Sequence, residues 1–146
     1  MLGFIQRPTT VDRHTYQNIL KYGHYSFNLI TQDFFEAAHQ TSARYEKGTN
    51  EFNKVGLTPI YKKEIRCPFV DESPLHIALE LHEDIEIKSN KTRLIVGKVI
   101  TISIPDSFLK NKSGLNFQEL KSINISGLSD YYILNKLKSL NYAKPN

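Results

Sequence analysis

The 146-residue sequence is 40% hydrophobic and carries eight Phe and eight Tyr, which is enough for one domain, residues 1–146, with a buried core. Nineteen Lys and Arg against fifteen Asp and Glu give a net charge of +4, and no run of like charge marks a nucleic-acid interface. Cys67 is the single cysteine, which excludes an internal disulfide, and without a long apolar run or a signal sequence the chain is expected to be cytoplasmic, with no membrane and no nucleic acid as partner.

The N-terminal part of the chain contains an expected strand, a polar turn and an amphipathic helix. Residues 1–7 have the apolar character of a strand. Asp12 is the predicted N-cap of a helix over residues 12–22, which Gly23 ends. The buried stripe of this helix has the i, i+3, i+4 spacing and consists of Tyr16, Ile19 and Leu20.

The start of this helix has the composition of an anion site. Free backbone N–H groups and the positive end of the helix dipole point out of a helix start. Here Thr15 adds a hydroxyl, and Arg7 and Arg13 add guanidinium groups, so a phosphate monoester is the natural ligand. The alternative is that Asp12 and Thr15 only cap the helix while both arginines are solvated, and the residues alone leave these two interpretations evenly matched.

The remaining pattern favours strands with short helices between them. Residues 24–30 are typical of a strand and residues 32–44 of a second amphipathic helix. Residues 45–74 form a long loop with a short helix at 51–55, which makes this stretch a candidate lid or dimer arm. Further along we expect strands at 75–87 and 93–104, a hairpin turn at 88–92, and weak helices at 116–122 and 135–140. The order predicts a mainly β protein, an antiparallel barrel with short α crossovers.

The strand at 75–87 carries a polar face that could be mistaken for a metal site. Its alternation predicts a buried face of Leu75, Ile77, Leu79, Leu81, Ile85 and Ile87. His76, Glu80 and His82 then share the opposite face, but residues four or six apart on a strand do not converge on one ion. We expect a solvated face and no metal.

No catalytic constellation stands out in the sequence. Asp71, Glu72 and Ser73 precede Pro74 and are more typical of a turn than of a catalytic pair. Nucleophile-elbow, phosphate-loop and dinucleotide-binding motifs are absent from the sequence. We therefore predict no catalytic side chain and a protein that binds and orients a cofactor.

The chain resembles the flavin reductase-like proteins, the FMN-binding split β-barrel family. The matching segments are 3–8, 13–19, 27–29, Ser42 with Tyr45, 48–52, 56–58, 72–74, 97–99 and 125–128 through Tyr131. Together they cover nearly the whole sequence. The resemblance implies a homodimer that binds FMN near the subunit interface and passes a hydride between NAD(P)H, FMN and a small-molecule acceptor.

The resemblance also implies particular flavin-binding residues. The basic residues and hydroxyl that hold the flavin phosphate match Arg7 and the Arg13-His14-Thr15 segment, where His14 replaces the more usual Asp. Asn18 matches an asparagine that fixes the turn. Residues near the flavin ring match Thr41, Ser42 and Tyr45.

One departure from the family pattern affects the functional prediction. Family members have strands before the position of Met1 that line the flavin, so the barrel is expected to be incomplete at its N-terminal side. The chain could be a fragment of a working reductase, a shortened relative completed by dimerisation, or a remnant without flavin. The leading hypothesis is an FMN-dependent NAD(P)H oxidoreductase, and the alternative is a truncated, non-catalytic split-barrel module that binds a partner or a small ligand without flavin turnover.

Overall fold

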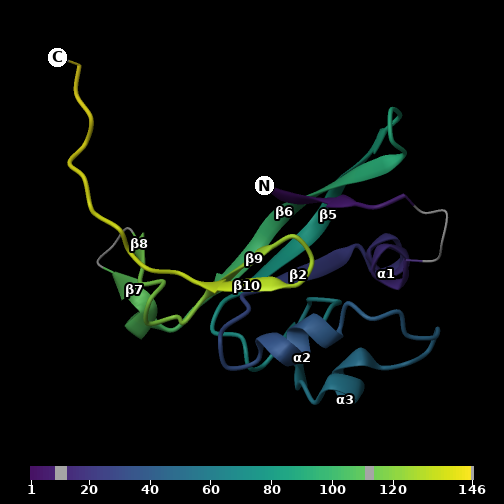
Figure 1. Ribbon diagram of the computed structural model, residues 1–146. Helices are drawn as coiled ribbons and strands as arrows, with labels where there is room; N and C mark the ends of the chain where they lie inside the picture. Colours follow the sequence, from purple (N-terminus) through teal and green to yellow (C-terminus); the bar gives the residue numbers. More distant parts are fainter. Residues whose placement is uncertain (9–12, 111–113, 146) are drawn as a thin grey trace.

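The computed structural model describes residues 1–8, 13–110 and 114–145. Its centre is a four-stranded antiparallel sheet in the order β1-β6-β5-β2, which curls into half of a barrel (Figure 1). The strands are β1 (Leu2–Gln6), β2 (His24–Asn28), β5 (His76–Ile87) and β6 (Thr92–Ser103). The predicted mainly β, antiparallel split-barrel class is therefore confirmed.

The first helix, α1 (His14–Tyr22), joins β1 to β2 and packs on the inner face of the sheet. Ile19 is its buried residue and joins a core of Tyr25, Leu79 and Ile95. Aromatic rings extend this core, because Tyr25 and Phe27 meet edge to face at 5.5 Å and Phe4 contacts both of them at 5.7 and 5.9 Å. The core thus lies directly beneath α1.

Two β-bulges change the alternation predicted for β5. The register with β6 shifts between Ala78 and Leu79 and again between Leu81 and Glu83. Ala78 and Leu79 are consequently both fully buried, whereas Ile85, predicted on the buried face, is 43% exposed. On the predicted face Leu79 is buried, Leu75, Ile77, Leu81 and Ile87 are half-buried, and the prediction is wrong for Ile85.

The polar face predicted for this strand is also corrected. His76 is buried against the Phe69 ring, and its Nε2 lies 2.8 Å from the Val70 carbonyl oxygen. Glu80 and His82 remain exposed. Among the described residues, no group of three or more His, Cys, Asp or Glu side chains could hold a metal ion.

Short elements connect and extend the sheet. The predicted helix at 51–55 is confirmed as α3 (Glu51–Val55), with the Asn50 side chain accepting the Asn53 N–H. The predicted hairpin turn at 88–92 is also confirmed between β5 and β6. The others are α2 (Phe35–Gln40), β3 (Pro59–Ile60), β4 (Phe69–Val70), the 3-10 turn η1 (Asp106–Phe108), β7 (Leu109–Lys110), β8 (Gly114–Leu115), β9 (Ile123–Ser126) and β10 (Asp130–Ile133).

Three predicted helices differ from the structure. The helix expected at 32–44 is confined to α2, because Thr31 pairs with Ser122 and its carbonyl oxygen accepts the Phe34 N–H in a turn. Residues 116–122 form turns, and residues 135–140 belong to a tail that runs away from the body without regular structure (Figure 1). The predicted N-cap Asp12 lies outside the described residues, and in the structure Arg13 occupies the N-cap position of α1.

The 45–74 segment is attached to the sheet rather than loose. The Ser26 hydroxyl donates a hydrogen bond of 2.7 Å to the Pro68 carbonyl oxygen, and the Asn28 side chain accepts the Val70 N–H at 3.1 Å. The lid or dimer-arm role of this segment stays a prediction. Within the part of the chain that the structure describes, no helix is both long and apolar enough to cross a bilayer.

Candidate functional site

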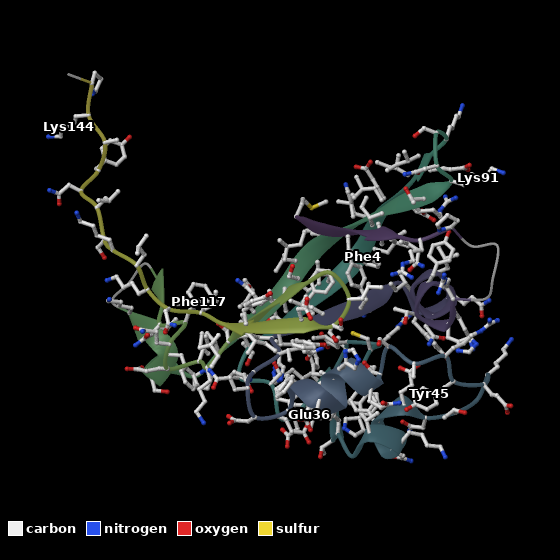
Figure 2. The ribbon with its side chains drawn as sticks, in the orientation of Figure 1. Phe4, Glu36, Tyr45, Lys91, Phe117 and Lys144 are labelled. Carbon is white, nitrogen blue, oxygen red and sulfur yellow. The ribbon has the colours of Figure 1, made fainter. Side chains whose placement is uncertain are left out.

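A cavity of about 620 Å³ opens between the start of α1 and the stretch that joins α2 to α3. In Figure 2 Tyr45 lies below α1 on that stretch. A volume of several hundred cubic ångströms is the usual size of a cofactor pocket. The cavity is lined by Gln6, Arg13, His14, Thr15, Ser42, Ala43, Arg44, Tyr45, Glu46, Lys47 and Glu51.

Most of the predicted site residues meet at this cavity although they are far apart in the sequence. Its lining includes Arg13, His14, Thr15, Ser42 and Tyr45. The remaining three do not line it: Arg7 and Asn18 are exposed, and the Thr41 hydroxyl donates to the Ala38 carbonyl oxygen at 2.7 Å. Thr41 therefore ends α2 instead of facing the cavity.

The start of α1 carries backbone N–H groups that have no acceptor within the helix. The first intrahelical hydrogen bond runs from the Gln17 N–H to the Arg13 carbonyl oxygen, at 3.0 Å. The N–H groups that precede Gln17 in the first turn have no earlier helical carbonyl to reach. The Arg13 side chain makes no capping bond to these donors, so within the described residues they can serve an acceptor in the cavity.

The sequence alone did not decide whether the Arg13 side chain is solvated or binds an anion. Among the described residues, its Nε is buried and has no hydrogen-bond partner. A buried donor without a partner costs free energy that a bound acceptor would recover. The interpretation of Arg13 as a fully solvated arginine is therefore disfavoured, and the site fits an anion.

Sequence reasoning missed several of the lining residues. Arg44 and Lys47 add positive charge, and Glu46 and Glu51 add two carboxylates, so Arg13, Arg44 and Lys47 outnumber the acids by one. The sequence did offer a signal for them, because Arg44 lies between the predicted Ser42 and Tyr45, and Glu46 and Lys47 follow Tyr45 directly. The surplus of positive charge favours an anionic ligand over a cationic one.

The far wall of the cavity is positioned by α2. The backbone N–H of Thr41 bonds to the Ala37 and Ala38 carbonyl oxygens, which ends the helix just before Ser42. The Gln40 amide then donates to the Tyr45 hydroxyl at 3.1 Å. These contacts fix the stretch that carries Ser42 and Tyr45 relative to α2, and both residues line the cavity together with Arg13.

The turn predicted from Asp71, Glu72 and Ser73 is structural. Both Glu72 carboxylate oxygens accept the Thr58 N–H, at 3.0 and 3.2 Å, and the buried Ser73 hydroxyl donates to backbone carbonyl oxygens. Partial desolvation raises the pKa of Glu72, but the hydrogen bonds from the Glu72 and Thr58 N–H groups outweigh it and hold this pKa below its ordinary value. Glu72 is a fixed anion that closes a loop.

Residues 2–121 match the Flavin reductase like domain. The chain belongs to this family. The match spans β1, α1 and the cavity as well as the whole central sheet. The resemblance on which the predicted site rests is thereby confirmed at the level of the family.

Solved structures agree with this assignment. A protein with a split barrel domain from Shewanella frigidimarina NCIMB 400, assigned as a flavin reductase, is 38% identical, with a TM-score of 0.90 over 97% of this chain and 70% of that one. Nitrilotriacetate monooxygenase component B from Bacillus cereus is 22% identical, with a TM-score of 0.82 over 94% and 70%. An FMN-binding protein from Thermus thermophilus with bound p-hydroxybenzaldehyde is 17% identical, with a TM-score of 0.72 over 95% and 71%. The last two show the fold alone.

A curated relative is also longer than this chain. An uncharacterized protein of Aquifex aeolicus (strain VF5) is 23% identical over 133 residues, which cover 91% of this chain and 66% of that protein. The chain thus spans about two thirds of the length of this relative.

Proposed function

We propose that this chain is an FMN-binding oxidoreductase domain that takes part in hydride transfer between NAD(P)H, FMN and a small-molecule acceptor. The observation that carries the proposal is the buried Nε of Arg13, which has no hydrogen-bond partner among the described residues and lies at the start of α1, on the edge of a cavity large enough for a cofactor. Membership of the flavin reductase-like family supports flavin as the ligand.

The proposed assignment of residues follows the lining of the cavity. The flavin phosphate is held by Arg13, the Thr15 hydroxyl and the first backbone N–H groups of α1, where the helix dipole also favours a dianion. His14 supplies a further nitrogen donor without adding negative charge. Ser42 and Tyr45 face the ring from the opposite wall.

When bound, the flavin supplies the hydride-accepting atom, N5, and the protein contributes position and charge. No side chain is assigned a nucleophilic or acid–base role. Arg7, Asn18 and Thr41 do not line the cavity, so no contact with the flavin is assigned to them.

We also propose that the protein works as a homodimer. Support comes from apolar side chains that the single chain leaves in solvent: Ile100, Ile102, Leu128, Ile133, Leu137 and Leu140 are each at least 46% exposed. Apolar side chains that a single chain leaves in solvent are candidates for burial in an interface.

A second candidate function is the partner-binding module without flavin turnover. The observation in its favour is β1, which pairs with β6 alone among the described strands and exposes Leu2 and Ile5. An open strand edge is a template for another chain. This function predicts a complex that binds neither FMN nor NAD(P)H.

The test is a titration of the purified chain with FMN and, separately, with riboflavin, followed by NAD(P)H oxidation with FMN present. Quenching of flavin fluorescence with clearly tighter binding of FMN than of riboflavin, and FMN-dependent loss of reduced nicotinamide absorbance, are the expected results. Absence of flavin binding would contradict the proposal and favour the partner-binding module.

A further inference from the structure

The start of α1 is not capped by the side chain of its N-cap residue, Arg13. Among the nine residues of the helix, Ile19 is the buried one. A helix this short is marginal by itself, so its first turn depends on tertiary contacts. Tyr16 makes one such contact.

Tyr16 ties the first turn of α1 to the hairpin of β5 and β6. Its hydroxyl donates a hydrogen bond of 2.7 Å to Asp84 Oδ2 on β5. The other carboxylate oxygen, Oδ1, accepts from Arg93 Nε on β6 at 2.6 Å. The guanidinium carbon of Arg93 also lies 5.8 Å from the centre of the Tyr16 ring. The three side chains form one connected unit.

This unit is shielded enough to have a defined geometry. The Arg93 and Asp84 side chains are only 24% and 19% exposed, in contrast to Glu86, which approaches Arg93 at 3.6 Å and is 55% exposed. Charge-assisted hydrogen bonds in such surroundings are stronger than exposed ion pairs. The Asp84 carboxylate is thereby held in place by Arg93, ready to accept the Tyr16 hydroxyl.

We infer that Tyr16, held by Asp84 and Arg93, is a positioning residue for the phosphate-binding turn of α1. The inference rests on the proposed function, because it assigns Tyr16 to the site formed by Arg13 and Thr15. Tyr16 follows Thr15 directly and shares the first helical turn with Arg13. Its hydroxyl bonds to Asp84 of the sheet, and its side chain is not part of the cavity lining. In this role Tyr16 fixes the direction in which the N–H groups and the Thr15 hydroxyl face.

The Tyr16→Phe variant tests this role, because it removes the hydroxyl and keeps the ring. FMN affinity is expected to fall about three- to tenfold while riboflavin affinity stays within about twofold, the size of one lost hydrogen bond. Amide hydrogen exchange of Gln17, whose N–H bonds to Arg13, is expected to accelerate relative to that of Gly23 at the other end of the helix.

Two further variants keep the test decisive. Asp84→Asn retains the shape of the side chain but loses its charge, and like Tyr16→Phe it is expected to lower FMN affinity. It replaces Tyr16→Phe as the test if that variant does not fold. Glu86→Gln is the matched control, since it removes only the exposed partner of Arg93, and FMN affinity is expected to stay unchanged.

The outcomes separate the inference from the proposed function. A wild-type protein that binds FMN no better than riboflavin overturns both. If the wild type does prefer FMN, equal losses of FMN and riboflavin affinity in Tyr16→Phe, or no loss of either, overturn the positioning role and leave the phosphate site standing.

Discussion

The Tyr25 ring lies so closely over Gly97 that a Cβ atom at residue 97 would overlap the Tyr25 hydroxyl. The same Cβ would also lie 2.9 Å from the Cβ of Leu79. Tyr25 and Leu79 are both in the buried core, so neither can move aside freely. Gly97 of β6 therefore leaves the space that the β2 aromatic residue fills.

Replacing Gly97 with alanine is expected to destabilise the protein by about 1–3 kcal/mol, the cost of overpacking a filled core. Chemical denaturation measures the change in the free energy of unfolding. Gly114→Ala is the matched control, because among the described residues the nearest heavy atom to its Cβ would be the Lys110 carbonyl oxygen at 3.9 Å. Equal midpoints for wild type and Gly97→Ala would contradict the assigned packing.

Removing the Tyr25 hydroxyl should not cost stability. Within the described residues this buried oxygen has no hydrogen-bond partner. Tyr25→Phe is therefore expected to leave the free energy of unfolding unchanged or to raise it by about 1 kcal/mol, since an unsatisfied buried polar group is removed. A loss above about 1 kcal/mol would point to a partner that this account lacks.

The same variant should alter the alkaline limb of the stability curve. Burial raises the pKa of Tyr25, so the folded protein holds this proton more tightly than the unfolded chain does. Above the ordinary tyrosine pKa of about 10, the unfolded chain releases the proton first, and stability falls as pH rises. In Tyr25→Phe this fall is expected to be shallower, which denaturation curves at a series of alkaline pH values would show.

Cys67 is expected to react slowly with alkylating reagents in the folded protein. The residue is 8% exposed, and burial raises the pKa of its thiol although a hydrogen bond with Ser26 opposes the shift. The thiolate is the reactive form, so the raised pKa slows the reaction, and the low exposure of the side chain slows it further. Mass spectrometry after timed labelling measures the rate, and a native rate equal to that of the denatured chain would be inconsistent with the buried position.

The sequence predicted those features that depend on local chemistry. The short helix at 51–55 was predicted within the long loop, and the structure shows Asn50 and Gly56 as its N-cap and C-cap. Arg13 and Thr15 were placed at a helix start because a polar turn leads there into an amphipathic stretch. These predictions needed no knowledge of distant contacts.

Features that depend on strand register or on distant partners could not be predicted in this way. The bulges in β5 reversed the exposure expected for Ile85, and His76 turned inward because Phe69 and Val70 lie beside it. The second helix was predicted too long because the pairing of Thr31 with Ser122 involves residues far apart in sequence. Arg44 and Lys47 were missed although they lie close to the predicted Tyr45 in the sequence, because the fold alone shows that they line the same cavity.

The proposed homodimer has a direct test in light scattering coupled to size-exclusion chromatography. A mass of about twice the 16.8 kDa of one chain is expected. The double variant Ile100→Ser with Ile102→Ser makes exposed β6 residues polar and is expected to shift the protein toward monomer. A wild-type mass of one chain across a wide concentration range would contradict the dimer.

The central claim, that the start of α1 captures a phosphate, is tested most directly by the double variant Arg13→Ala with Thr15→Ala. FMN affinity, measured by flavin fluorescence, is expected to fall at least about tenfold while riboflavin affinity stays within about twofold, because only FMN carries the phosphate. Arg66→Ala, an exposed arginine outside the cavity, is the control and should change neither. Equal losses for FMN and riboflavin in the double variant would contradict the claim.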